Sequence, residues 1–439
     1  MQKWNDFGSV WRRRTATTGG AVLIGLVALA FAASADKAME AFEFVLARWP
    51  YAPLALTPAA YAAIVWITRR YVPEARGSGI PQVIAGSHNA ASAANARLTS
   101  LRTAAFKFVL TILALGAGGS VGREGPTVQI SAALMEGMHR LFRVPLTAAV
   151  TIAGGAAGVS AAFNTPLAGV AFAIEELASA YEQRLALLVM AAVMISGLVS
   201  LGIAGDYLYF GAVHDVLSIK AAIVISPVAG VLGGIAGGLF SRTMLWFTAS
   251  DWHPVAAVRS RPILWAATAG LVIALIGVFG ANLTWGTGYS VARSIIEGGH
   301  EPLWFGPAKF ATTLLTALSG IPGGIFAPSL AAGTGLGQIL TAIFPGEPVG
   351  AVVVLGMIAY FVGVVRAPLT AVLIVSEMTD GHKLILPLFA TAIIADGVSA
   401  LVCKERLYHG LSRSFRDPKV ATPDNAEAYQ PSEPHGKSA

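Results

Sequence analysis

The sequence predicts an all-α membrane protein, an inverted-repeat bundle of broken and tilted transmembrane helices. First, 55% of the 439 residues are hydrophobic and 12% are charged, whereas a soluble domain carries about 25% charged residues. Second, 48 glycines and 23 prolines interrupt the apolar segments, which predicts short helices that end inside the membrane around a polar cavity. Third, the chain contains an internal repeat.

Apolar runs of about membrane-spanning length recur along the chain. A first span is expected from about Thr15 to Ala35, with or without a continuation to Trp49, and a second from Pro53 to Thr68. The clearest apolar runs are Ala21–Ala33, Ala104–Ala117, Leu185–Ile203, Ile219–Phe240, Ile263–Ala281, Val349–Val365 and Leu384–Val402.

The net charge of +6 comes from basic residues in loops and at the chain ends, and does not indicate nucleic-acid binding. Arg12–Arg14 precede the first span and a basic group from Lys404 to Lys419 follows the last, so the positive-inside rule predicts that both termini are cytoplasmic. The single cysteine, Cys403, excludes an intramolecular disulfide, and the histidines lack metal-ligand spacing. No metal or cofactor is expected.

The internal repeat has a constant offset of 202 residues and needs no gap between residues 107 and 177. Glycine, proline and lysine matches are more than shared hydrophobicity produces, so a duplication is indicated. With repeats of about 15–205 and 220–403, an odd number of crossings in each would invert one against the other and place the site near the membrane midplane. The matches include Lys107 with Lys309, Gly122 with Gly324, Pro126 with Pro328, Pro166 with Pro368 and Glu175 with Glu377.

The expected organisation is a membrane transport domain over residues 1–411 and a disordered cytoplasmic tail over 412–439. The tail is rich in charged residues, serine and proline, and it has too few apolar residues for a folded core.

The segment from Gly122 to Ile130 carries the strongest functional signal. Proline fits the start of a helix, so a helix is expected from Pro126, with the amides of Glu124 and Gly125 free at its positive end. Such an end attracts anions, and Glu124 is an anion tethered there that can act as a gate. The alternative is a structural ion pair with Arg123, but carboxylates buried in membranes are usually functional.

Two further loops share this pattern of glycine, polar residue and proline. Ser78 lies in Gly77-Ser78-Gly79-Ile80-Pro81 and would alone be an ordinary helix cap. The amides of Ile325 and Phe326 lie in the loop that repeats the Glu124 segment; otherwise that loop would serve packing only.

Glu175 and Glu176 end the apolar run that begins at Pro166. Adjacent residues on a helix point about 100° apart, so at most one of the two carboxylates faces inward. Periodicity does not decide between them, and a helix end at the membrane boundary is the simpler alternative. Enzymes are disfavoured, because the sequence has no phosphate-binding loop, HExxH or GxSxG motif.

The motifs GSGIP at 77–81, GREGP at 122–126 and GGIFAP at 323–328 occur in that order. They resemble the three signature segments of the CLC chloride channels and proton–chloride exchangers, and the resemblance covers residues 15–411. It implies a homodimer with one anion pathway in each subunit. Because no paired nucleotide-sensing domains follow, it further implies a compact prokaryotic type in the inner (plasma) membrane.

The resemblance also implies roles for single residues. Chloride would be bound by the Ser78 hydroxyl, by Tyr408 and by the amides of Ile325, Phe326 and Gly125. Bromide and nitrate would be tolerated.

The proton-handling residues follow from the same resemblance. Glu124 would be the gate and outer proton carrier, and Glu176 the inner proton-transfer glutamate. Arg123 and Lys107 would support the site, Lys107 by raising the local positive potential.

The resulting expectation is a secondary-active chloride/proton antiporter. A passive Glu124-gated chloride channel is the first alternative, because Gln82 and Ile84 stand where the exchangers often carry acidic residues. A cation-coupled uptake carrier with broken helices is a more remote one, since no cage of aspartates is evident in the spans.

Overall fold

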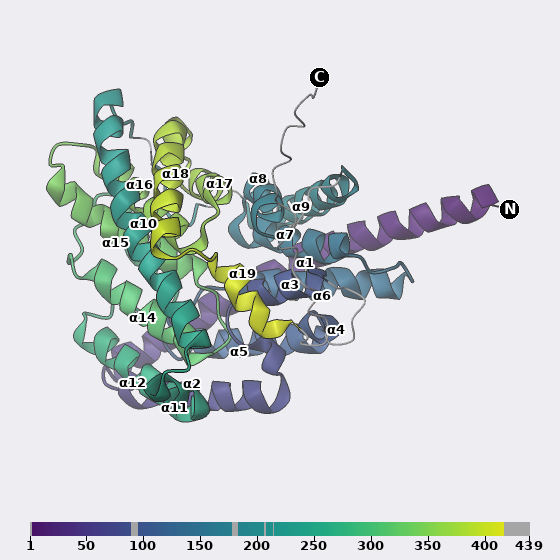
Figure 1. Cartoon of the computed structure of the whole chain (residues 1–439), viewed down its shortest axis with the longest axis horizontal. Helices are drawn as coiled ribbons and strands as arrows, with labels where there is room; N and C mark the ends of the chain where they lie inside the picture. Colours follow the sequence, from purple (N-terminus) through teal and green to yellow (C-terminus); the bar gives the residue numbers. More distant parts are fainter. Residues whose placement is uncertain (1, 89–94, 178–182, 206–207, 214, 417–439) are drawn as a thin grey trace, which may run out of the picture.

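The computed structural model describes residues 2–88, 95–177, 183–205, 208–213 and 215–416, and within these ranges its regular secondary structure is helical apart from one isolated two-residue bridge (Figure 1). The elements of the first half are α1 (Gln2–Arg48), α2 (Pro53–Tyr71), η1 (Pro73–Ala75), α3 (Ile80–His88), α4 (Asn95–Leu98), α5 (Leu101–Leu115), α6 (Glu124–Leu141), α7 (Ala148–Phe163), α8 (Pro166–Phe172), η2 (Ala173–Leu177) and α9 (Gln183–Ala204).

The second half repeats the main helices of this series, and α11, α19 and η4 are additional short elements. Its elements are α10 (Ile219–Ala249), α11 (His253–Ser260), α12 (Pro262–Phe279), α13 (Tyr289–Ile296), α14 (Phe305–Ser319), α15 (Phe326–Ile343), α16 (Val349–Val365), α17 (Pro368–Thr379), η3 (His382–Leu384), α18 (Ile385–Val402), α19 (Leu407–Ser412) and η4 (Arg413–Phe415).

Among the described residues, six helices are long and apolar enough to cross a membrane, and three apolar helices are shorter, as the many glycines and prolines predicted. Two of the short helices, α7 and α16, form the centre of the bundle and are buried on nearly all sides. A helix that is apolar all round is stable only when it is buried in this way.

The two halves lie side by side (Figure 1), with most helices of the first half on one side and those of the second on the other. The same neighbours recur in each half: α6 packs on α7 as α15 packs on α16, and α1 packs on α9 as α10 packs on α18. Helices α2 and α12 pack across the junction, as do α8 and α17. The predicted duplication is therefore confirmed as a structural repeat.

The inversion of the halves is visible in two contacts between equivalent residues. Gly122 and Gly324 form an antiparallel bridge, with N–H···O distances of 2.7 and 2.8 Å in the two directions. Equivalent segments that pair antiparallel run in opposite directions, as an inverted repeat requires.

The second contact is a reciprocal helix cap. The carboxylate of Glu175 accepts the amides of Leu369 and Thr370 at the start of α17, at 3.0 and 2.8 Å. Glu377, its equivalent, accepts the amides of Leu167 and Ala168 at the start of α8, at 3.4 and 3.1 Å. Each half thus caps a helix of the other.

Three boundaries differ from the sequence-based expectation. The first span is one continuous helix, α1, that includes the predicted lead of residues 1–14 from Gln2 onward and reaches Arg48. Helix α6 begins at Glu124, two residues before Pro126, because proline is tolerated throughout the first turn, where N–H groups lack intrahelical partners. Helical structure continues to Phe415, so the expected tail boundary at 412 is too early; residues 417–439 lie outside the described part.

Candidate functional site

The three glycine-rich loops found in the sequence meet at one point. The bridge between Gly122 and Gly324 joins the second loop to the third. The amide of Gly323 donates to the carbonyl of Gly77 at 3.1 Å and joins the third loop to the first. Helices α3, α6 and α15 begin directly after these loops, so three positive helix ends converge there.

Close approach of these loops requires glycine at position 125. A Cβ atom built on Gly125 would lie 2.4 Å from the Ser78 hydroxyl oxygen and 3.2 Å from the Cα of Gly324. The amide of Gly125 in turn lies next to Gly324, where a Cβ would come within 2.9 Å of it. Ser78, Gly125 and the α15 loop therefore line one small volume.

The hydroxyls of Ser78 and Tyr408 face this volume without a partner. Tyr408 comes from α19, at the far end of the chain, and is fully buried, with its ring 5.9 Å from that of Phe326. Within the described residues, neither hydroxyl makes a hydrogen bond, although the two lie near each other. Buried hydroxyls are nearly always hydrogen-bonded, so two unpartnered ones in one place indicate a ligand site.

The aromatic residue Phe326 begins α15 and organises the surroundings of this site. Its ring lies 5.0 Å from Phe361 and 5.9 Å from Phe163, and it also contacts Phe172. The N-cap of α15 is Ile325. The amides of these two residues, Ile325 and Phe326, thus sit at the free positive end of the helix, as the sequence predicted.

Glu124 is the first residue of α6 and is fully buried. Its Oε1 accepts a hydrogen bond from the hydroxyl of Tyr289 at 2.5 Å. Its Oε2 has no hydrogen-bond partner of normal geometry in the described residues, and the amide of Ala327 in the first turn of α15 acts on the carboxylate electrostatically. The carboxylate therefore occupies the junction of two helix N-termini, a place suited to an anion.

Arg123 turns away from this carboxylate. Its Nη1 donates to Asp36 at 2.8 Å and to the carbonyl of Ala32, and its Nη2 donates to the hydroxyl of Tyr209 at 2.8 Å. The described residues include no ion pair between Arg123 and Glu124, so the alternative of a structural pair is not supported. Through these hydrogen bonds Arg123 instead holds the loop before α6 against α1.

The two repeat-related lysines hold the loops that precede α3 and α13. Nζ of Lys107 donates to the carbonyls of Ala75 and Gly77 at 2.8 and 2.6 Å, just before Ser78. Nζ of Lys309 donates to Thr284 and Gly286 at 2.9 and 2.7 Å. Both side chains are fully buried, and neither pairs with a carboxylate among the described residues. That Lys107 raises the positive potential at the site stays a prediction.

The choice between Glu175 and Glu176 is decided by the caps described above. Glu175 caps α17, whereas Glu176 is buried, with 1% of its surface exposed, and its two oxygens lack hydrogen-bond partners in the described part. His409 of α19 lies beside it, with Nδ1 3.4 Å from Oε1 of Glu176. Both glutamates belong to η2, a single π-helical turn, and such turns are frequent at functional sites.

Gln82, one of the two departures from the acidic pattern, has a structural role here. Its amide donates to the carbonyls of Glu74 and Arg76, at 3.1 and 2.6 Å, and so holds the segment before Ser78. Ile84 is buried in the main hydrophobic cluster.

A cavity of about 340 Å³ leads to Ser78 and Tyr408 from one side of the molecule. Arginines 69, 76 and 259 contribute to its walls. Positive groups at an entrance attract anions without holding them at the narrow point.

Tyr289 was not identified in the sequence, although a signal for it exists. Gly286-Thr287-Gly288-Tyr289 repeats Gly77-Ser78-Gly79-Ile80 at an offset of 209, and all four glycines have positive φ. The first half has seven more residues between Ile80 and Lys107 than the second half has between Tyr289 and Lys309, and this insertion removes the match from the 202-residue register. His409 lacked any repeat or motif signal.

The fold and the site define an integral membrane protein in which two inverted halves bring helix N-termini to one buried point, beside the carboxylate of Glu124. A family model for voltage gated chloride channels matches residues 59–400. The chain belongs to this family, the CLC proteins.

Curated relatives match over most of their length. The chain is 31% identical over 426 residues to the H(+)/Cl(-) exchange transporter ClcA of Yersinia pestis bv. Antiqua (strain Angola), which covers 89% of this chain and 85% of the relative. It is 32% identical over 394 residues to the protein of the same name from Vibrio cholerae serotype O1, with 82% and 79% covered.

Solved structures share the fold. A slow cyanobacterial Cl⁻/H⁺ antiporter superposes with a TM-score of 0.79 at 24% identity, covering 92% of this chain and 98% of that one. A eukaryotic CLC transporter gives 0.75 at 20% identity, with 93% and 74% covered. A CLC-type fluoride/proton antiporter gives 0.73 at 22% identity, with 91% and 98% covered.

Proposed function

We propose that this protein is a secondary-active chloride/proton antiporter. The observation that carries the proposal is the position of Glu124: an ionisable side chain lies at the joint N-termini of α6 and α15, beside two hydroxyls without partners. A site that attracts anions and already holds a tethered carboxylate allows the two to exchange. The names of the curated relatives favour exchange over passive conduction.

Chloride would be bound by partial charges. The ligands are the hydroxyls of Ser78 and Tyr408 and the amides of Gly125, Ile325 and Phe326. Helix ends and hydroxyls replace part of the hydration shell, whereas a full positive charge would bind chloride too tightly for release. The serine at position 78 favours chloride, and we expect bromide and nitrate to be accepted.

Protons would enter and leave through two carboxylates. When Glu124 is ionised it competes with chloride for the outer position; when it is protonated it leaves that position and carries the proton. Glu176 would pass protons between the inside of the protein and the cytoplasm. The two fluxes are then coupled, because one side chain serves both.

The assembly and placement are part of the same proposal. The protein would be a homodimer in the inner (plasma) membrane, with both termini in the cytoplasm and a transport domain over residues 1–411. Transport of this kind makes and breaks no covalent bond except to protons. The proposal therefore includes no enzymatic activity and no cofactor.

Purified protein in liposomes tests the proposal. With an outward chloride gradient and an external pH electrode, the wild-type protein should move protons against their gradient. Glu124→Gln should abolish proton movement and retain chloride flux, and Glu176→Gln should slow or uncouple protons. Tyr360→Phe is the control, because Tyr360 is also buried but has no role in the proposal. A reversal potential that follows only chloride would instead identify a channel.

A further inference from the structure

The carboxylate of Glu176 has no direct access to solvent. It is 1% exposed, and its oxygens have no hydrogen-bond partner within the described ranges. A group that passes protons to Glu176 must lie within hydrogen-bond reach of its carboxylate, or one water molecule away, and must itself be exposed to solvent.

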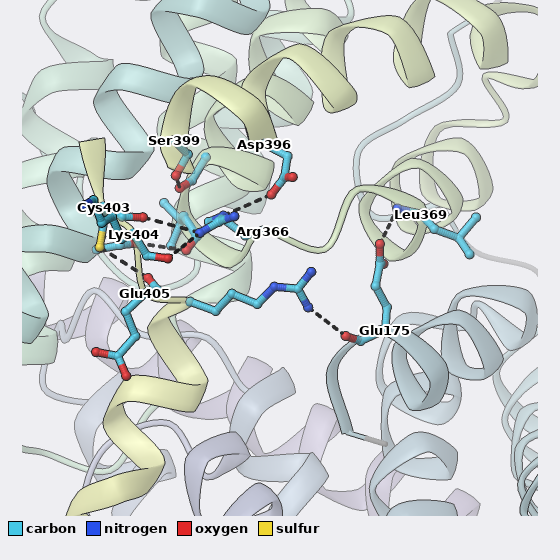
Figure 2. A network of polar contacts seen from close by, with 12 residues as sticks. Glu175, Arg366, Leu369, Asp396, Ser399, Cys403, Lys404 and Glu405 are labelled. Carbon is cyan, nitrogen blue, oxygen red and sulfur yellow. Dashed lines mark hydrogen bonds and ion pairs between the residues drawn. The ribbon is translucent and has the colours of Figure 1, made fainter. Parts of the chain in front are cut away.

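Glu175 cannot be that group while it caps α17. Its Oε1 accepts the amide of Leu369 at 3.0 Å, and its Oε2 accepts both the amide and the hydroxyl of Thr370 at 2.8 Å. Figure 2 shows the carboxylate of Glu175 directed at Leu369. Both of its oxygens are thus occupied at a helix N-terminus.

His409 meets both requirements. Its Nδ1 lies 3.4 Å from Oε1 of Glu176 and makes no hydrogen bond in the described part of the chain. Its side chain is 39% exposed, against 1% for that of Glu176. An imidazole titrates near neutral pH and has one nitrogen for each of two partners, so it can face solvent and carboxylate together.

The position of His409 is fixed from two directions. Nη1 of Arg406, at the start of α19, donates to the carbonyl of Glu175 at 3.1 Å, which binds α19 to η2. Residues 406 and 409 are three apart and share one helix face. This bond therefore places the imidazole opposite Glu176.

The linker before α19 is anchored as well. Arg366 donates to Asp396 at 3.0 Å and to the carbonyls of Cys403 and Lys404, as Figure 2 shows. The main chain that leads into α19 is thereby held at two successive carbonyls. A side chain on so short a helix keeps its position only if the preceding linker is fixed.

Few other ionisable groups lie near His409. Glu175 and Glu176 come from η2 and Arg406 from the start of α19. The elements packed against α19 carry four further groups: His88 on α3, Arg242 on α10, Arg366 at the end of α16 and Arg413 on η4. Arg413 pairs with Glu405. Apart from Glu176, no described residue forms an ion pair with His409.

We propose that His409 carries protons between the cytoplasm and Glu176. This inference rests on the role proposed above for Glu176. The imidazolium gives its Nδ1 proton to Oε1 of Glu176, which leaves a neutral imidazole, protonated at Nε2, and a neutral carboxyl group. The imidazole ring then turns so that Nδ1 reaches cytoplasmic water, takes up a proton there and turns back, and the same steps run in reverse when protons leave.

The test is proton transport by His409→Gln in liposomes. A positioned acid–base group accelerates proton transfer by about 10²–10⁴-fold, so we expect the proton rate to fall at least tenfold. The pH profile of the wild-type proton rate should show an inflection that the variant lacks. The matched control is His88→Gln, a histidine linked to Arg416 beside η4, which should change neither.

A chemical rescue separates a relay from a structural role. Free histidine is a zwitterion that crosses bilayers poorly, and its imidazole can enter the space that the side chain vacates. A buffer of histidine, compared with PIPES of equal pH and capacity, should restore part of the proton rate of His409→Gln. Chloride flux in a Glu124→Ala background should be unaffected by the substitution, since no proton step is then needed.

Three outcomes overturn the inference: an unchanged proton rate, a loss that histidine does not restore, or an equal loss of chloride flux in the Glu124→Ala background. Glu176→Gln measured in parallel separates this failure from that of the proposed function. If Glu176→Gln keeps full proton transport, the role of Glu176 itself is wrong. If only His409→Gln keeps it, protons reach Glu176 by another route.

Discussion

The substitution Tyr289→Phe removes the hydrogen bond that the Tyr289 hydroxyl donates to Glu124, the proposed gate. In the wild-type protein the Tyr289 hydroxyl donates to Oε1 of Glu124 at 2.5 Å; Glu124 is fully buried and Tyr289 is partly buried. The ring itself stacks on Tyr209 at 4.9 Å and contacts Phe210 at 5.2 Å. Phenylalanine keeps these ring contacts and removes only the hydroxyl.

The magnitude follows from the kind of bond. A hydrogen bond to a charged group contributes about 1.5–3 kcal/mol, and here no water replaces the lost donor because Glu124 is fully buried. The ionised Glu124 side chain in the anion position is therefore destabilised by about that amount relative to the same side chain displaced from that position. Since chloride competes with this carboxylate, its apparent affinity should rise by about tenfold or more, at about 1.4 kcal/mol for each factor of ten.

Chloride binding measured by titration calorimetry on the purified protein provides the assay. The same substitution is made in a Glu124→Ala background, where the competing carboxylate is absent. A double-mutant cycle then isolates the coupling between the two side chains. Tyr289→Phe should tighten binding in the wild-type background and leave it unchanged in the Glu124→Ala background.

Two results would refute this reasoning. An unchanged affinity in the wild-type background would mean that the hydroxyl does not hold the gate. An equal change in both backgrounds would mean that Tyr289 acts on chloride directly or through the fold, and not through Glu124.

Two further predictions concern the backbone of the site. Gly125→Ala should reduce chloride flux at least tenfold, because its Cβ would lie 2.4 Å from the Ser78 hydroxyl. The matched control in the same flux assay is Gly137→Ala on the same helix, where the atom nearest to the added Cβ is 3.4 Å away. Equal effects of the two substitutions on chloride flux would contradict the argument. Glu175→Ala and Glu377→Ala should each lower the free energy of unfolding by about 1 kcal/mol, because each removes a helix cap, and should leave the proton-to-chloride ratio unchanged. Thermal melts measure the stability, and liposome fluxes measure the ratio. A changed ratio in Glu175→Ala would give that residue a role in proton transfer.

The scaffold of the site was predictable because it depends on backbone conformation. Glycines at tight approaches and prolines in first turns mark where helices start, and a constant offset shows that the two halves share these points. From this pattern the meeting of Gly122 with Gly324 and the placement of Ser78 followed. The start of α6 was two residues off, since proline marks a first turn and not its first residue.

The partners of the two glutamates were not predictable in the same way. Tyr289 reaches Glu124 from a segment shifted by an insertion, and His409 reaches Glu176 from a short helix outside the repeats. Such contacts depend on tertiary structure that no local pattern encodes. For the same reason, periodicity could not choose between Glu175, which meets α17, and Glu176, which meets α19.

The repeat also shows why the site has a direction. Glu124 and Phe326 occupy equivalent positions, as do Ser78 and Thr287 when the insertion is taken into account. The backbone is therefore nearly symmetric at the point where the halves meet, while the side chains are not: one half provides a carboxylate and the other an aromatic ring beside Tyr408. A symmetric pair of helix ends would bind an anion equally from both sides. The difference between Glu124 and Phe326 places the titratable barrier on one side only, and coupling to protons requires that asymmetry.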